Sequence, residues 1–354
     1  MRILVINPGS TSTKLAIYDN GKMVLEETLR HEASKIDKFE KMIDQYNFRL
    51  DIINQFLTES KYEINTFDGI IGRGGLLKPI PSGVYNVSEN MLKDLEEAKY
   101  GEHASNLGAI LAFELAKLAN CPSFIADPVV VDELDDIARV SGIPDIERIS
   151  IFHALNQKAS AKRAAKELGK NYNECNLIVA HLGGGVSVGA HSRGLVVDVN
   201  NALDGDGPFS PERSGGVPIG GLVKMCFSGK YTMDEIKKKI KGKGGIVAYL
   251  GTNSCLEVQQ MIQSNDEKAK LVYEAMAYQV SKEIGSLAAA LKGEVDAVVL
   301  TGGIAYDKDN LVPWIKERVD FIAPVIVYPG ENEMEALYNA CVEGLQKPEM
   351  VKEY

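Results

Sequence analysis

The amino-acid sequence begins with ILVINPGSTSTKLAIYDNG (residues 3–21), in which a turn of small residues separates two apolar runs. The run Ile3–Ile6 is rich in β-branched residues, Leu15–Tyr18 is a second apolar run, and Asp-Asn-Gly follows it. This order predicts a β-hairpin at the start of the chain. The stretch LIVAHLGGGVSVGAHSRG (177–194) repeats the layout near the middle of the chain. We therefore predict an internal duplication of one strand–turn–strand unit.

Helical patterns occur between and after these hairpins. Four stretches share a helical spacing of apolar residues: Ser34–Leu57, Ser105–Leu118, Asn156–Leu168 and Val272–Leu291. A strand is predicted for Asp296–Leu300, directly before Thr301-Gly302-Gly303-Ile304, and a final helix for Met334–Leu345. Strands that alternate with helices favour a mixed α/β architecture.

Length and composition limit the possible classes of protein. A chain of 354 residues predicts about two domains. The net charge of −10 argues against nucleic acid as the main partner, because phosphate backbones bind basic faces. We expect no membrane span and no secretory signal, since no apolar run has the length or the flanks for either. The five cysteines are scattered and form no CxxC pair, which predicts free thiols in a cytoplasmic protein.

Three glycine-rich turns each follow an apolar run: NPGSTSTK (7–14), HLGGGVS (181–187) and TGGI (301–304). Glycine lets backbone N–H groups approach an oxyanion, and Ser and Thr hydroxyls add further donors. One such turn alone is usually a tight connection, but three together favour phosphate binding. Neither the P-loop pattern nor the dinucleotide pattern of glycines occurs. Two hairpins around a nucleotide, with a later strand–Gly-Gly–helix, are instead the plan of the actin, hexokinase and Hsp70 group.

Together, six motifs resemble the acetate/butyrate kinase (acetokinase) family, and its butyrate kinases most. The motifs occur in the family's order: NPGSTSTK (7–14), GEHASN (101–106), ISIFHA (149–154), HLGGG (181–185), ERSGG (212–216) and TGGIAYD (301–307). The resemblance implies an α/β fold with two duplicated domains of the actin/hexokinase/Hsp70 type and a nucleotide cleft between them. It assigns residues 1–152 and the C-terminal helix, 334–354, to an acid- and phosphoryl-binding domain. Residues 153–333 would form the nucleotide-binding domain.

The resemblance also implies the reaction and its site residues. ATP and Mg²⁺ would phosphorylate a short-chain carboxylic acid, butyrate or a branched analogue, to its acyl phosphate. The reverse direction would form ATP, and the enzyme would be a homo-oligomer. The catalytic residues would be Arg73, Asp127, His153 and Arg213. The acid would lie against Arg73, Gly75 and His103. The nucleotide and its phosphates would lie against Asn7, Ser10, Ser12, Lys14, His181, Gly184, Gly185, Gly303 and Ile304. Asn7 and Glu333 would hold the metal, with Glu335 near enough to leave the register open.

The chemistry of these residue types agrees with such a reaction. Phosphoryl transfer to a carboxylate brings anions together, so the protein mainly aligns them and neutralises charge. A planar guanidinium can hold carboxylate or phosphoryl oxygens bidentately, and a histidine N–H adds a hydrogen bond. The acid is already ionised near neutral pH, so we assign Asp127 to orient an arginine or a metal-bound water rather than to abstract a proton.

Alternative interpretations stay open at the level of sequence. Arg73 is also compatible with a solvated surface group, and His103 and His153 with hydrogen-bonded core histidines. His31 and His191 lie in no motif and are predicted to be structural or exposed.

Departures from the acetate-type pattern bear on specificity. Gly75 stands where acetate kinases have valine, which predicts more room for the acyl chain. Asn253-Ser254-Cys255-Leu256 and Asp307 leave the adenine contacts around residues 253–257 open. Rival functions are an acetate or propionate kinase and an actin- or chaperone-like nucleotide switch. The predicted anion pocket, with two arginines beside histidines, argues against the switch.

Overall fold

The computed structural model describes residues 1–36 and 38–354. The chain forms two compact units. Unit 1 consists of Met1–Val131 with Asn332–Tyr354, and unit 2 of Asp132–Glu331. The functional domain limits that the sequence suggests stay a prediction.

A six-stranded sheet forms the centre of unit 1. Its strands are β1 (Arg2–Pro8), β2 (Ser12–Asp19), β3 (Lys22–Arg30), β4 (Gly69–Arg73), β5 (Val84–Asn86) and β6 (Ser123–Ala126), in the order β3-β2-β1-β4-β6-β5. β1 and β2 pair antiparallel from Arg2↔Asp19 to Pro8↔Thr13, so the predicted N-terminal hairpin is confirmed. β4 pairs parallel with β1, and β6 pairs parallel with β4.

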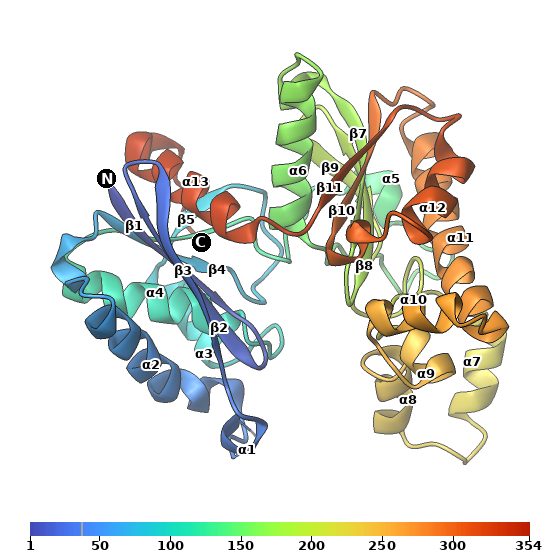
Figure 1. The fold of residues 1–354 in the computed structure, drawn as a ribbon, viewed down its shortest axis with the longest axis horizontal. Coiled ribbons are helices and arrows are strands. Elements are labelled where there is room, and N and C mark those ends of the chain that lie inside the picture. Colours follow the sequence, from blue (N-terminus) through green and yellow to red (C-terminus); the bar gives the residue numbers. More distant parts are fainter. Residues whose placement is uncertain (37) are drawn as a thin grey trace. The chain divides into compact units, whose positions relative to one another are not determined.

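Helices cover both faces of this sheet (Figure 1). α2 (Tyr46–Glu59) and α4 (Asn106–Ala119) pack on one face, where Leu4, Ile6 and Ile70 are fully buried. α13 (Glu333–Gln346) packs on the other face and contacts β1, β4 and β6. The smaller elements of unit 1 are α1 (Ala33–Ile36), η1 (Met42–Gln45), η2 (Ile64–Thr66), α3 (Glu89–Glu96) and η5 (Pro348–Met350). Burial on both faces explains why the central strands β1 and β4 contain continuous apolar runs.

The helix predicted for Ser34–Leu57 is wrong as one continuous element. α1 and α2 are separate, and η1 lies before α2. The backbone at Lys41 is extended, and its N–H donates to the Asp44 carboxylate (3.0 Å), which starts a new helical segment. Residue 37, inside the predicted range, lies outside the described residues.

The sheet of unit 2 repeats the strand order of unit 1. Its strands are β7 (Asn176–Leu182), β8 (Val186–Ser192), β9 (Leu195–Val199), β10 (Ala297–Gly302) and β11 (Val325–Pro329), in the order β11-β10-β7-β8-β9. As in unit 1, three strands form an antiparallel meander, and two further strands add in parallel beside the first. The same order of addition in both units bears out the predicted duplication.

Helices again cover both faces of the unit-2 sheet (Figure 1). α6 (Ala154–Glu167) packs on β7 and β10, while α11 (Glu267–Ala290) packs on the other side against β7 and β8. The remaining helices are α5 (Asp136–Arg139), η3 (Tyr172–Glu174), α7 (Ile219–Cys226), α8 (Met233–Ile240), α9 (Ile246–Leu250), α10 (Cys255–Gln263), η4 (Gly303–Tyr306) and α12 (Leu311–Val319). α4, α6, α11 and α13 confirm four of the predicted helices. In the described part of the chain, no helix combines the length and apolar character that crossing a membrane requires.

Two glycines bring α4 into backbone contact with β4. A Cβ added to Gly72 would lie 2.0 Å from the carbonyl oxygen of Gly108, and one added to Gly108 would lie 2.2 Å from that of Arg73. Both distances are far below any van der Waals contact, so only glycine lets helix and strand approach this closely. The contact fixes the end of β4, where Arg73 lies.

We expect Gly108→Ala to lower the free energy of unfolding by about 2 kcal/mol or more, because the methyl group meets fixed backbone. The matched control is Gly285→Ala in α11, where nothing lies within 4 Å of the added Cβ. Alanine there should raise stability by up to about 1 kcal/mol through helix propensity. Urea denaturation measures both, and an equal gain in the two variants would contradict the close contact.

Candidate functional site

Three predicted site residues meet in unit 1. Asn7 lies near the end of β1, Arg73 ends β4, and Glu333 begins α13. Arg73 Nη1 and Asn7 Nδ2 both donate to Glu333 Oε2, at 2.9 and 2.8 Å. Glu333 is only 6% exposed, whereas the Arg73 side chain is 23% exposed. Arg73 is therefore anchored by a buried carboxylate while part of its guanidinium stays accessible.

The structure separates the two candidate glutamates. Glu333 is buried in the Asn7–Arg73 cluster, while Glu335 is exposed. The carboxylate of Glu335 acts instead on Tyr18, whose pKa burial and Glu335 raise to about 12. Only Glu333 is placed with the other candidate residues.

Asp127 follows β6 in a strained backbone conformation. Its φ is +39°, in the left-handed region that a residue with a side chain rarely adopts. The Ser82 hydroxyl (2.6 Å) and the Gly83 N–H (2.8 Å) both donate to Asp127 Oδ1. These bonds hold the carboxylate at the same edge of the sheet as Arg73, since β4 and β6 are parallel neighbours.

His103 lies in the loop before α4 with its ring orientation fixed. The backbone N–H of Ser105 donates to His103 Nδ1 (3.2 Å), and the Ser105 hydroxyl lies 2.8 Å from the same nitrogen. A nitrogen that accepts an N–H carries no proton, so the neutral ring has its hydrogen on Nε2. His103 can therefore donate from Nε2.

Asn106, which the sequence analysis gave no role of its own, joins two loops of this cluster. Its Oδ1 accepts from the Leu76 N–H and its Nδ2 donates to the Gly101 carbonyl, both at 2.9 Å. The first loop follows Arg73 and the second precedes His103. Asn106 is 3% exposed, so it is a buried positioning residue.

Gly75 faces this asparagine. A Cβ at Gly75 would lie 2.5 Å from Asn106 Oδ1 and 2.6 Å from Asn106 Cα. Glycine here lets the loop pack on the start of α4, and the volume of the missing side chain is already filled. The interpretation that Gly75 opens room for a longer acid is therefore not supported by the local geometry.

A fully buried arginine lies beneath the first glycine turn. Arg49 of α2 donates from Nη1 to the Ser12 carbonyl (3.0 Å), and from Nη2 to the carbonyls of Gly9 (2.9 Å) and Ser10 (3.3 Å). Its Nε and Nη2 also bind Gln45 Oε1. Burial lowers the pKa of Arg49 to about 10, so it still carries its charge at neutral pH. Sequence reasoning missed it, although an arginine four residues before the apolar Ile53 in a helical stripe was a usable signal.

Arg49 also orients the amides of the turn. In a trans peptide unit the C=O and the following N–H point in opposite directions. The Gly9 and Ser10 carbonyls point at Arg49, so the N–H groups of Ser10 and Thr11 point away from it. Ser10 and Thr11 are exposed, which leaves an outward pair of donors suited to a phosphate oxygen.

The other predicted residues of this turn, Ser12 and Lys14, are more exposed to solvent than Arg49. Ser12 begins β2 and is partly exposed. Lys14 Nζ pairs with Glu26 Oε1 (3.1 Å), with 39% and 34% of the side chains exposed. An exposed ion pair contributes at most about 1 kcal/mol, so it leaves Lys14 able to bind an arriving phosphate.

Two predicted histidines stack in unit 2. The rings of His153 and His181 lie 3.8 Å apart and 9° from parallel. His153 Nδ1 lies 2.9 Å from the Ser187 hydroxyl, and His181 Nδ1 lies 2.7 Å from Asn156 Oδ1. His181 is in β7 and His153 immediately precedes α6, so strand and helix together position the pair.

Arg213 lies against the second glycine turn, residues 181–187. A Cβ at Gly185 would lie 1.9 Å from Arg213 Nη1, so the guanidinium rests on the bare backbone there. The Ser210 hydroxyl donates to the Gly184 carbonyl (2.6 Å), which ties the turn to the loop before Arg213. Burial lowers the pKa of Arg213, with Glu212 opposing the shift.

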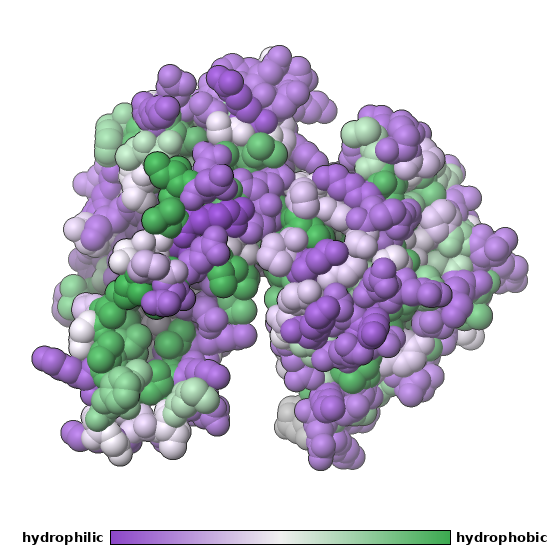
Figure 2. Space-filling model, turned by 180° about the vertical axis from the view of Figure 1, so that it is seen from behind, coloured by the Kyte–Doolittle hydropathy of each residue, from purple (hydrophilic) through white to green (hydrophobic). Residues whose placement is uncertain are grey.

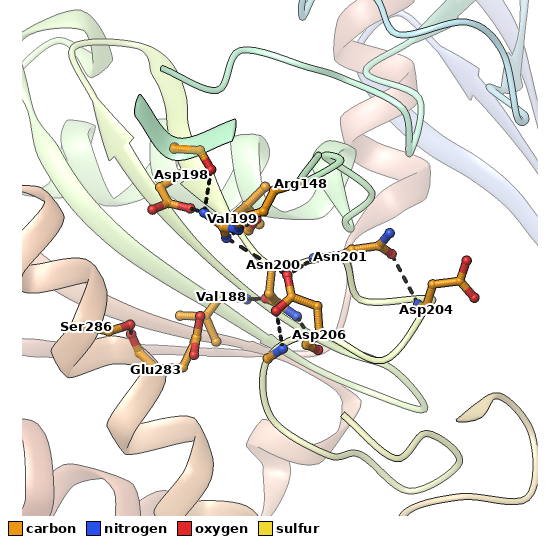
Figure 3. A network of polar contacts seen from close by, with 12 residues as sticks. Arg148, Val188, Asp198, Val199, Asn200, Asn201, Asp204, Asp206, Glu283 and Ser286 are labelled. Atoms are coloured by element: carbon orange, nitrogen blue, oxygen red, sulfur yellow. Dashed lines mark hydrogen bonds and ion pairs between the residues drawn. The ribbon is translucent and has the colours of Figure 1, made fainter. Parts of the chain in front are cut away.

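Asn200 binds backbone groups on both sides of the loop between Asn200 and Asp206 (Figure 3). It is fully buried, accepts from the Val188 N–H (2.8 Å) and donates to the Asp206 carbonyl (3.3 Å). The loop between them presents the Ala202 carbonyl, to which Arg213 Nη1 donates at 2.5 Å. Sequence reasoning gave Asn200 no role because its partners are backbone groups distant in sequence.

The third turn connects β10 to η4. Gly302 has a φ of +92°, and a Cβ there would lie 2.3 Å from the Leu182 carbonyl oxygen. Around Gly303 nothing lies within 4 Å of such a Cβ, and Ile304 is buried. Asp307 accepts from the N–H groups of Asp309, Asn310 and Leu311, so it caps α12. The Asn253 side chain donates to Glu212, next to Arg213.

The predicted site residues thus form clusters at one end of each sheet. In unit 1 the structure brings together Asn7, Arg73 and Glu333, with Asp127 on the neighbouring parallel strand. In unit 2 it pairs His153 with His181, and Arg213 with Gly185. Guanidinium groups, imidazole N–H groups and turn amides are suited to bind anions and to neutralise developing charge.

Comparisons with known proteins identify a family and similar structures. The profile of the acetokinase family matches residues 146–323, half of the chain. Acetate kinase from Porphyromonas gingivalis has a similar structure (TM-score 0.79, 20% identity), with coverage of 96% of this chain and 99% of that one. A propionate kinase from Francisella tularensis gives a TM-score of 0.74 at 20% identity, with 97% and 99% covered. Acetate kinase from Entamoeba histolytica gives 0.76 at 16% identity, with 96% and 98% covered. The predicted α/β fold of the actin/hexokinase/Hsp70 type is confirmed.

His31 gives the turn a measurable pH dependence. The Thr13 hydroxyl accepts from Arg49 Nη1 (3.0 Å) and lies 2.9 Å from His31 Nε2. Burial, and then the nearby Arg49 charge, lower the pKa of His31 to about 4. As the pH falls, His31 is therefore protonated in the unfolded chain at a higher pH than in the folded chain. The free energy of unfolding decreases between about pH 6.5 and 4.

We expect His31→Gln, which keeps an acceptor for Thr13, to lose less stability than the wild type over that window. The difference should be at most about 3 kcal/mol. Urea denaturation at pH 7, 5.5 and 4.5 measures it. His191, whose pKa burial lowers to about 3, contributes equally in both proteins. Parallel pH profiles of the two proteins would contradict the assignment.

Proposed function

The chain belongs to the acetokinase family, and we propose that it transfers a phosphoryl group between ATP and a short-chain carboxylic acid. The preference for butyrate or a branched analogue is proposed from the resemblance of the six sequence motifs alone, since Asn106 fills the space beside Gly75. The observation that carries the proposal is the Asn7–Arg73–Glu333 cluster at the end of β1 and β4. Arg73 is held there by one buried carboxylate and keeps part of its guanidinium accessible. An accessible guanidinium is what an acid and a phosphoryl group, both anionic, require.

Each cluster has a distinct part in the proposal. In unit 1, Arg73 and the Nε2–H of His103 bind and orient the acid. Asp127 orients an arginine or a metal-bound water. In unit 2, Arg213 and His153 bind the oxygens of the transferring phosphoryl group. Because the acid is already ionised, the chain has no proton to remove, and its work is alignment and charge neutralisation. Acyl phosphates are reactive anhydrides, so we propose that the reaction also runs towards ATP.

The donor set near Asn7 fits Mg²⁺. Asn7 offers an amide oxygen and Glu333 a carboxylate, and Mg²⁺ in kinases takes one or two carboxylates with water and phosphate oxygens. Among the described residues, no group of three or more His, Cys, Asp or Glu side chains is placed to hold a metal alone. A metal at Asn7 and Glu333 would thus depend on the nucleotide for further ligands. It would supply charge neutralisation of the phosphates.

The glycine turns fit a nucleotide. The outward amides of Ser10 and Thr11 and the turn at Gly184–Gly185 suit phosphate oxygens. Gly303 has open space where a side chain would lie, which suits a nucleoside against the backbone before Ile304. The contacts of the adenine around residues 253–257 stay open.

We propose that the protein works in the cytoplasm as a homo-oligomer. Ile219 and Val223 of α7 and Phe227, which follows the helix, recur at helical spacing and are 69%, 48% and 87% exposed. Figure 2 shows hydrophobic surface at the lower left, in the part of unit 2 that contains α7 to α9 in Figure 1. Exposed apolar stripes of this kind favour association with another protein surface.

The decisive experiment measures ADP formation and hydroxamate trapping with acetate, propionate, butyrate, isobutyrate and valerate. We expect acyl phosphate to form, and kcat/KM to be highest for butyrate or isobutyrate. Arg73→Ala should lower kcat by about 10²–10³-fold, since it removes a positively charged hydrogen-bond donor to the reacting groups. A maximum at acetate or propionate would favour the rival carboxylate kinases. ATP hydrolysis that no acid changes would favour a nucleotide switch.

A separate experiment tests whether Glu333 or Glu335 holds the metal. Glu333→Gln should lower kcat strongly and raise the Mg²⁺ concentration for half-maximal rate, because it removes the buried carboxylate beside Asn7 and Arg73. The matched change Glu335→Gln, on the exposed side of the same helical turn, should leave both values near those of the wild type. The assignment fails when the two variants are affected in the opposite order.

A further inference from the structure

A continuous chain of hydrogen bonds runs through the interior of unit 2 to His153. The Tyr172 hydroxyl lies 2.7 Å from His191 Nδ1, and His191 Nε2 lies 3.0 Å from Gln157 Oε1. Gln157 Nε2 donates to Ser187 Oγ (2.8 Å), which lies 2.9 Å from His153 Nδ1. Gln157, Ser187 and His191 are fully buried, so water does not replace these partners.

The direction of each bond follows from what the groups can donate. Gln157 Nε2 also lies 3.0 Å from the Ser187 carbonyl, which only accepts, so the amide NH₂ faces Ser187. The amide oxygen therefore faces His191 and must accept from its Nε2–H. Burial lowers the pKa of His191 to about 3, so this ring is neutral and its Nδ1 accepts from the Tyr172 hydroxyl.

The same reasoning assigns the last bond. Ser187 Oγ accepts from Gln157 Nε2 and from the backbone N–H of His153 (3.4 Å). Both lone pairs of the hydroxyl are then used, and its one hydrogen is left for His153 Nδ1. A neutral His153 therefore carries its own hydrogen on Nε2.

The strand is built to admit this chain. Ser187, Gly189 and His191 alternate along β8 and share one face of the sheet. A Cβ at Gly189 would lie 2.5 Å from Gln157 Oε1 and 3.4 Å from His191 Nε2. Any other residue at this position would displace the glutamine that transmits the bond direction.

We propose that Ser187, Gln157 and His191 are positioning residues that fix the Nε2–H tautomer of His153, so that this ring presents a donor to the phosphoryl oxygens. The inference deepens the proposed function, on which the role of His153 rests. Because the hydrogen is already on Nε2, no proton has to move between the ring nitrogens when the phosphoryl group binds.

A neighbouring histidine provides an internal control. Asn156 Nδ2 donates to the Glu331 carbonyl (2.6 Å), so Asn156 Oδ1 faces His181 Nδ1 at 2.7 Å and accepts from it. His181 therefore has its hydrogen on Nδ1, the opposite tautomer to the His153 ring stacked on it. The two rings should be distinguishable in one spectrum.

The test is the tautomer state itself, read from two-bond ¹H–¹⁵N correlations of the ¹⁵N-labelled protein at neutral pH. His153→Gln and His181→Gln assign the two rings. We expect an Nε2–H pattern for His153 in the wild type. Ser187→Ala, and to a lesser degree Gln157→Met, should shift His153 towards a mixture and leave His181 and His31 unchanged. Ser192→Ala, a matched change on β8 outside the chain, should leave all rings unchanged.

Kinetics separate this inference from the proposed function. We expect Ser187→Ala to lower kcat by about 10–100-fold with little change in the KM for the acid. An Nδ1–H pattern for His153 in the wild type, or an unchanged Nε2–H pattern in Ser187→Ala, would overturn the inference. A shifted tautomer with full kcat would support the hydrogen-bond chain and remove His153 from the proposed reaction. Unchanged His181 signals in Ser187→Ala and Gln157→Met verify that unit 2, which contains both substitutions, stays folded.

Discussion

The parallel pairing of β4 with β1 is the constraint on which the unit-1 cluster depends. The pair register Ile6↔Gly72 places Asn7 and Arg73 at the same edge of the sheet, one residue beyond the last paired positions. Next to this edge, α4 lies in backbone contact with β4, which the glycines at 72 and 108 permit. β10 pairs with β7 in the same sense in unit 2, and brings Thr301 beside His181. The duplicated strand order thus generates two equivalent edges from one topology.

The buried charge of Arg49, beneath the first glycine turn, is satisfied by neutral acceptors. Arg49 is fully buried, and its hydrogen bonds go to backbone carbonyls, a hydroxyl and an amide oxygen. Burying an ion costs several kcal/mol, and hydrogen bonds to every donor of the guanidinium can offset this cost. A carboxylate partner would also offset it, but would cancel the positive charge. A cation satisfied by neutral oxygens keeps its field. This explains how a chain with a net charge of −10 can offer a local site for anions.

The predictability of each feature follows the range of the interactions that form it. The hairpins, the strand before Thr301 and four helices are set by local periodicity and turn chemistry, so the sequence was sufficient for them. The helix at 34–57 was wrong because a side chain, Asp44, binds the backbone of Lys41 and restarts the helix. Gln157 and Asn200 escaped notice because their partners are distant in sequence. Gly75 was identified correctly as unusual, but its reason is the close approach of Asn106 rather than an enlarged pocket.

The two stacked histidines show why polar side chains are buried behind the candidate site. Imidazole alone gives no preference between its nitrogens large enough to fix a donor, so the surroundings must decide. For His181, the Asn156 amide oxygen determines which ring nitrogen carries the hydrogen. For His153, the Ser187 hydroxyl determines it, and Gln157 sets the direction of that hydroxyl. Both decisions trace back to backbone carbonyls, at Glu331 and at Ser187, which can only accept. The fixed polarity of the backbone is therefore transmitted, through one or two side chains, to the hydrogen that each ring presents.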